Sequence, residues 1–240
     1  MDISAFTGIA LNGTGFSNDF LLLVTLLLLI VCSIVLRTNS FLFGKLLVNL
    51  NADERRQSIT ETTESDTFFF VIFMSFQTTI LLSIFMFSYG VENGYFIPSG
   101  YFSGLLVLTT IMLLLLVFFI INYGVIYFTG RIFDDRSKYL TLFSNFQSMF
   151  CLWGISLYLP VIYILVLGEY NSTAYILLII SYLLYRIMFI YRFIYIFFNQ
   201  KAGFLFFSLY LCALEMTPLV CLYEGMIYIF NIIETNNLWH

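Results

Sequence analysis

The sequence has little charge and almost no histidine. Charged residues make up 10% of its 240 residues, and the single histidine is the last one, His240. Soluble globular proteins are about a quarter charged, so this composition excludes that class. A lone terminal histidine argues against histidine-based catalysis and against an internal zinc site. We therefore expect no metal.

Catalytic motifs are also missing. The chain has no HExxH, no Walker loop and no GxSxG, the patterns that carry zinc, phosphate and nucleophile chemistry. The adjacent acids Asp134 and Asp135 lack the pattern of a metal-dependent lipid transferase, and we interpret them as charges on a turn beside Arg131 and Arg136. The sequence predicts no catalytic residue, no cofactor and no nucleic-acid partner.

Disulfide bonds are not expected either. All four cysteines fall inside apolar segments, where a thiol behaves as a small polarisable hydrophobic group. They are Cys32, Cys151, Cys212 and Cys221. Their positions say nothing about the redox compartment.

What the sequence has in abundance is long apolar runs. Hydrophobic residues make up 61% of the chain, and the mean hydropathy is +0.96. A helix that crosses a bilayer needs about 20 mainly apolar residues. The sequence therefore predicts an all-α integral membrane protein, with residues 1–240 forming one bundle of six transmembrane helices. The predicted spans are residues 20–36, 67–90, 101–129, 144–167, 173–200 and 203–233.

The basic residues of the predicted loops all lie on one side of the membrane. They fall in or beside the first loop (residues 37–66), the third and the fifth, whereas the second and fourth loops and both termini have none. The positive-inside rule then predicts that these three loops are cytoplasmic and that both termini are periplasmic. The start of the 37–66 loop has the composition of an amphipathic surface helix, but we favour a plain linker over a docking site.

The last two spans each carry a charge deep in the membrane. Arg186 and Glu215 lie about equally far from the connecting turn at Lys201, roughly 20 Å at 1.5 Å per residue. An ionised group at this depth is costly unless it is paired, so we predict an ion pair between Arg186 and Glu215. Two roles stay open for the pair: registration of the two helices, which we favour, and a site that responds to protons or substrate.

Pro218 follows Glu215 closely and predicts a kink in the sixth helix, because proline removes a backbone donor and crowds the preceding turn. A broken helix beside a charge is found in transporters, but kinked membrane helices also occur without that role.

Glu224 has no basic residue in the outer half of any span to neutralise it. It is our candidate for a partner contact or a hydrated cavity. In the hairpin formed by the second and third spans, Gln77 and Asn122 are candidates for an interhelical amide contact.

The run LYLCALEMTPL at residues 209–219, the six-span layout and the Tyr185–Arg186 step carry a family resemblance. With these features the sequence resembles a family of uncharacterised polytopic inner-membrane proteins of Bacteroidota, defined by a domain of unknown function. The resemblance implies a multi-pass protein of the cell inner membrane of a Gram-negative bacterium. It implies no mechanism.

Three functions remain as hypotheses. We favour a non-catalytic subunit that lies in the lipid bilayer and associates with other inner-membrane proteins, in envelope biogenesis or protein export. The alternative is a small proton-coupled transporter in which Glu215 titrates beside Arg186 and Pro218 is the hinge. An intramembrane lipid-modifying enzyme has the weakest support.

Overall fold

The computed structural model describes residues 18–40, 44, 64–92, 101–132, 136–167 and 171–197. These residues are almost entirely helical, and none of them forms a strand. The helices are α1 (Asn18–Thr38), α3 (Glu64–Glu92), α4 (Tyr101–Ile132), α5 (Arg136–Ser156), α6 (Tyr158–Leu167) and α7 (Asn171–Phe197).

Five stretches of helix in this part of the chain are long and apolar enough to cross a membrane. Each overlaps one of the first five predicted spans, with α5 and α6 together forming the fourth. The sixth span at 203–233, and with it the kink at Pro218, lies outside the described residues. The fold is therefore that of an α-helical, multi-pass membrane protein.

At the connection between α4 and α5, the two helices are longer than the sequence predicted. A charged loop was expected over residues 131–143, but α4 continues to Ile132 and α5 begins at Arg136. The stretch contains neither proline nor glycine to stop a helix. Charged residues end the apolar run without ending the helix, because a helix can continue beyond the hydrocarbon into water. This predicted loop was therefore too long.

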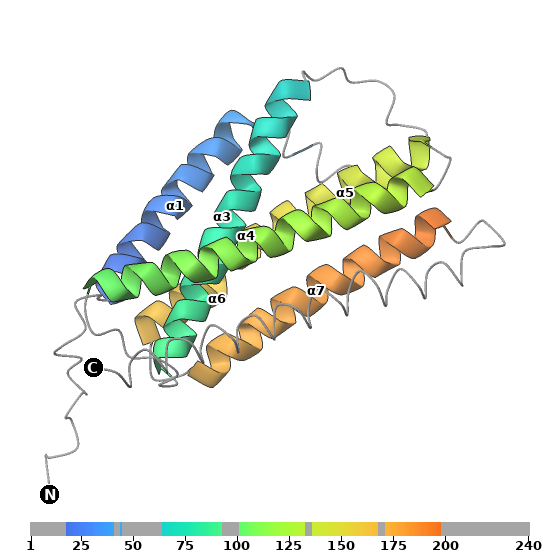
Figure 1. Cartoon of the computed structure of the whole chain (residues 1–240). Helices are drawn as coiled ribbons and strands as arrows, with labels where there is room; N and C mark the ends of the chain where they lie inside the picture. Colours follow the sequence, from blue (N-terminus) through green and yellow to red (C-terminus); the bar gives the residue numbers. More distant parts are fainter. Residues whose placement is uncertain are drawn as a thin grey trace, which may run out of the picture.

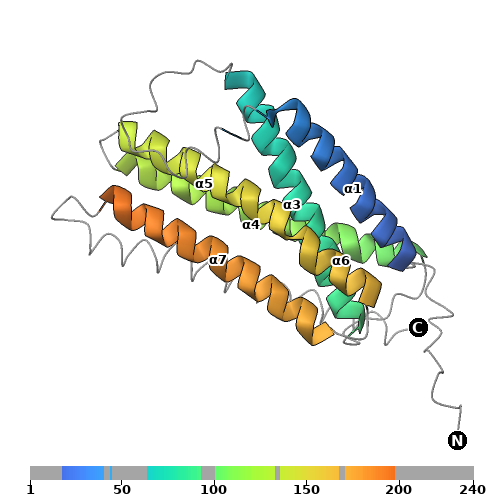
Figure 2. The ribbon, with the colours of Figure 1, turned by 180° about the vertical axis from the view of Figure 1, so that it is seen from behind.

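Helix α3 lies at the centre of the bundle. It packs against α1, α4, α5 and α6, while α7 packs on the other side of α5 and α6 (Figures 1 and 2). The most apolar parts of α3 and of the α5–α6 pair are mostly buried, whereas only a small share of those of α1, α4 and α7 is buried. Apolar helix faces of this kind are suited to a lipid bilayer.

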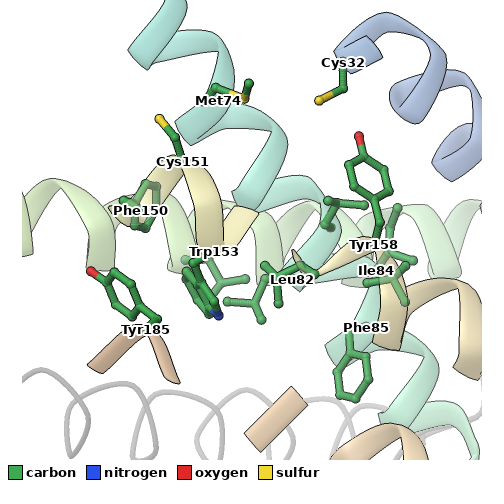
Figure 3. Packing of buried hydrophobic residues seen from close by; sticks show 14 of the residues in the cluster. Cys32, Met74, Leu82, Ile84, Phe85, Phe150, Cys151, Trp153, Tyr158 and Tyr185 are labelled. Carbon is green, nitrogen blue, oxygen red and sulfur yellow. The ribbon is translucent and has the colours of Figure 1, made fainter. Parts of the chain in front are cut away.

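Aromatic rings fill much of the interface between α5 and its neighbours. Trp153 stacks on Tyr185 of α7 with 5.2 Å between ring centroids, and Phe150 meets Phe119 of α4 edge-on at 5.0 Å. Figure 3 shows Phe150, Trp153 and Tyr185 together in this part of the core. Such pairs contribute roughly 0.5 to 1.5 kcal/mol each beyond burial. The Trp153–Tyr185 pair joins α5 to α7 and the Phe150–Phe119 pair joins α5 to α4, in a lipid environment that supplies no hydrophobic drive for helix association.

The fourth span is interrupted at Leu157, which separates α5 from α6. Pro160 has no N–H to donate to the carbonyl of Ser156, its partner one turn earlier. The backbone still continues through the interruption, because Leu157 N donates to Trp153 O at 3.1 Å and Val161 N donates to Leu157 O at 3.2 Å. The break is a local change of helix geometry within a continuous span.

Candidate functional site

Arg186 is half-buried on α7 and is held by two tyrosines of its own helix. Its Nε donates a hydrogen bond to the Tyr182 hydroxyl at 2.8 Å. The guanidinium carbon lies 5.2 Å from the centre of the Tyr182 ring and 5.7 Å from that of Tyr185, both within cation–π range. The helix itself thus provides aromatic contacts for a cation that lies within the candidate span Ser172–Tyr191.

The same tyrosines form one wall of a groove of about 180 Å³, which we call the arginine groove. Its lining comes from α3, α4, α5 and α7, and consists of Leu82, Met86, Phe118, Phe119, Asn122, Phe146, Phe150, Trp153, Leu178, Tyr182, Tyr185 and Arg186. Nearly all of this surface is apolar. The groove can hold an apolar group that carries an acidic or hydrogen-bond-accepting head, because Arg186 is the one cation among its described lining residues.

Trp153 adds a donor to this lining. Its side chain is 7% exposed, and its Nε1 has no hydrogen-bond partner among the described residues. Asn122, by contrast, uses its Nδ2 within α4, donating to Phe118 O at 3.0 Å. Of these two side chains, Trp153 thus carries the donor that no described residue uses.

The side-chain amides of Gln77 and Asn122, which the sequence suggested as an interhelical contact, do not hydrogen-bond to each other. Neither amide atom of Gln77 has a hydrogen-bond partner among the described residues. The polar contact between α3 and α4 is instead made by Ser75 Oγ and Tyr123 OH, 3.3 Å apart. Gln77 lies near Cys32 of α1. The expected contact fails because Gln77 is turned toward another side of α3.

Three predicted site residues, Glu215, Pro218 and Glu224, lie outside the described residues. The ion pair of Arg186 with Glu215 therefore stays a prediction. Cys32 and Cys151 are buried free thiols. Within the described ranges, no group of three or more His, Cys, Asp or Glu side chains could hold a metal ion.

A second, larger groove of about 310 Å³ lies beside α7, and we call it the serine groove. It is lined from α5, α6 and α7 by Met149, Leu152, Trp153, Ser156, Leu159, Pro160, Leu177, Ile180, Ser181, Leu184, Tyr185 and Met188. Ser156 Oγ lies 2.6 Å from Ser181 Oγ, and it also donates to Trp153 O at 2.7 Å. Because a hydroxyl has one proton, Ser181 is the donor between the two serines.

The sequence prediction missed the serine groove. The sequence does contain features that could have indicated this groove. Ser156 and Ser181 are small polar residues within predicted spans, and Pro160 follows Ser156 by one turn. Small and polar residues of this kind are typical of contacts between membrane helices. Nothing in the sequence alone paired the two serines.

The chain is similar to one known protein family, but not to a curated protein or a solved structure. No curated protein and no solved structure matches the chain. One protein family matches, described as a domain of unknown function (DUF4271), over residues 21–226. The match covers most of the 240 residues. The chain therefore belongs to the DUF4271 family.

Proposed function

We propose that this membrane protein is a non-catalytic subunit that associates with other proteins of a bacterial inner membrane, in envelope biogenesis or protein export. The observation that carries the proposal is the serine groove, a mainly apolar groove of about 310 Å³ on the side of the bundle formed by α5, α6 and α7. We assign it to a transmembrane helix of a partner protein.

The chemistry of the serine groove favours a helix over a lipid chain. Its walls include the exposed side chains of Leu159, Ile180 and Leu184, which a partner helix would cover. Its lining also offers polar groups. These are the Ser156 and Ser181 hydroxyls. An acyl chain cannot use these groups, whereas a helix with serine, threonine or asparagine can hydrogen-bond to them.

Photo-crosslinking in native membranes tests this assignment. A photoreactive residue at Leu184, inside the serine groove, should capture a discrete membrane protein. The same residue at Leu113 should capture none or much less, because Leu113 is a similarly exposed leucine of α4 that does not line the groove. Equal products at both positions, or lipid adducts alone at Leu184, would reject the assignment.

The arrangement within the membrane is also a proposal. The basic residues support an orientation with both termini periplasmic and with the 37–66 loop in the cytoplasm. The resemblance to Bacteroidota proteins supports the inner membrane as the compartment. Reporter fusions that are active on only one side of the membrane, placed after Thr38 and at the C-terminus, would decide the orientation.

A second candidate function is a small proton-coupled transporter. The observation that favours it is the interruption of the fourth span at Leu157 close to the arginine groove, since Trp153 lines that groove one turn earlier. In this proposal Glu215 titrates beside Arg186. Glu215→Gln should then leave a folded protein whose transport in vesicles has lost its pH dependence. A variant that fails to accumulate would favour a structural role for the pair.

A further inference from the structure

A cluster of buried polar side chains lies where α1, α3 and α6 meet, away from both grooves. Gln77 of α3 is 1% exposed, Tyr158 of α6 is 7% exposed and Cys32 of α1 is 3% exposed. None of the three lines the arginine groove or the serine groove. We call these residues the polar cluster.

The hydrogen-bonding groups of the polar cluster are near one another without satisfying one another. The thiol of Cys32 interacts with both the Gln77 side chain and the Tyr158 hydroxyl, and Figure 3 shows Tyr158 pointing its hydroxyl toward Cys32. Yet neither amide atom of Gln77, nor the Tyr158 oxygen, has a partner of hydrogen-bond geometry among the described residues. A thiol is a weak donor and acceptor and does not replace a strong partner.

Leaving these groups without a partner would be costly. A buried polar group that lacks its hydrogen bond is strongly destabilising, and lipid offers no replacement. A single bridging molecule can satisfy several such groups at once, provided that it both donates and accepts. Gln77 supplies a donor and an acceptor, and Tyr158 can act as either. All three groups are uncharged at neutral pH, so the ligand that fits them is small and neutral.

We propose that the polar cluster of Cys32, Gln77 and Tyr158 binds water inside the membrane-spanning bundle. The cluster is within reach of one membrane edge, because Cys32 precedes Arg37 by five residues and Gln77 follows Phe69 by eight, or roughly 8 to 12 Å along a helix. Tyr158 is also the first residue of α6, after the interruption at Leu157. The proposal holds whichever function of the protein is correct.

Exchange of the Cys32 thiol proton in heavy water tests the proposal. The protein is reconstituted in lipid with Cys32 as its one cysteine, and the infrared S–H stretching band is followed after transfer to D₂O. Water in the cluster should convert S–H to S–D rapidly. A control protein carries its one cysteine as Ile111→Cys, at a position that is 0% exposed on α4, where no described side chain is a buried polar group without a partner. Its band should persist.

Two further variants link the exchange to the cluster. In the Cys32 protein, Gln77→Leu should slow exchange by about tenfold, the effect expected for loss of a hydrogen bond to the bridging water. Tyr158→Phe removes only a hydroxyl and should act in the same direction, which keeps the test informative if Gln77→Leu does not fold.

Two results would contradict the binding of water by the polar cluster. A Cys32 S–H band that persists as long as that of the Ile111→Cys control would overturn the proposal. So would a band that shifts in frequency on Gln77→Leu but never exchanges, because that result shows a direct bond between Cys32 and Gln77 in a dry core.

Discussion

Gly154 of α5 lies directly against Thr78 of α3, so that a methyl group at position 154 would collide with Thr78 Oγ1. The Thr78 hydroxyl is itself fixed, since it donates to Met74 O at 2.7 Å. The absence of a side chain at Gly154 therefore allows α3 and α5 to approach closely, a use of small residues that is common in membrane bundles.

Gly154→Ala should destabilise the bundle by about 1 to 3 kcal/mol, the usual cost of overpacking. The measurement is the free energy of unfolding in mixed micelles. Thr78→Ala removes the colliding atom, so the double variant should recover part of the loss, with a coupling of roughly 0.5 kcal/mol or more. Strictly additive losses would show that the two helices do not touch at this point.

Loss of the hydrogen bond between Ser156 and Ser181 should lower the free energy of unfolding only slightly. Ser181→Ala should lower the free energy of unfolding by about 0.6 kcal/mol, the average for interhelical hydrogen bonds in a membrane protein. Thr109→Ala is the matched control, because within the described part of the chain its hydroxyl bonds to Leu105 O and Leu106 O of its own helix. Equal losses in the two variants would mean that the serine pair does not join α5 to α7.

The predicted ion pair of Arg186 with Glu215 is tested by exchanging the charges. Arg186→Glu and Glu215→Arg should each reduce the amount of folded protein in the membrane, because each leaves two like charges in hydrocarbon. The double variant restores opposite charges and should recover most of the loss. If the double variant accumulates no better than the worse single one, the two residues are not partners.

Glu224 is expected to act on association more than on folding. Glu224→Gln should leave expression and unfolding unchanged while lowering the recovery of co-purified proteins several-fold, because the acid has no basic partner in the outer half of the predicted spans. The recovery of partners relative to the tagged protein is quantified by mass spectrometry. Unchanged recovery would remove Glu224 from the list of contact residues.

The five candidate membrane spans among the described residues followed from the sequence for a simple physical reason. Lipid requires about 20 apolar residues in each crossing helix, and such runs are visible without any knowledge of packing. The ends of α4 and α5 did not follow, because charge marks where the hydrocarbon ends and not where the helix ends. The interruption at Leu157 lies close to Pro160, which lacks the N–H that a regular helix needs there.

The side-chain contacts were harder to predict than the spans. Helix α3 is apolar over most of its circumference, so the pattern does not show which face meets α4 and which meets α1. Gln77 and Asn122 were therefore matched by position along their helices, whereas rotation about the helix axis separates them. Arg186 was recognised because charge in a span is conspicuous, but its contacts with Tyr182 and Tyr185 required the structure.

The most direct test of the proposed subunit role is purification of the tagged protein from its native membrane in a mild detergent. Mass spectrometry should find other inner-membrane proteins in stoichiometric amount. Leu184→Trp, which fills the serine groove, should remove them, whereas Leu113→Trp on α4 should not. A protein that purifies alone or only as a homodimer, with both variants behaving like the wild type, would contradict the subunit role and favour the transporter.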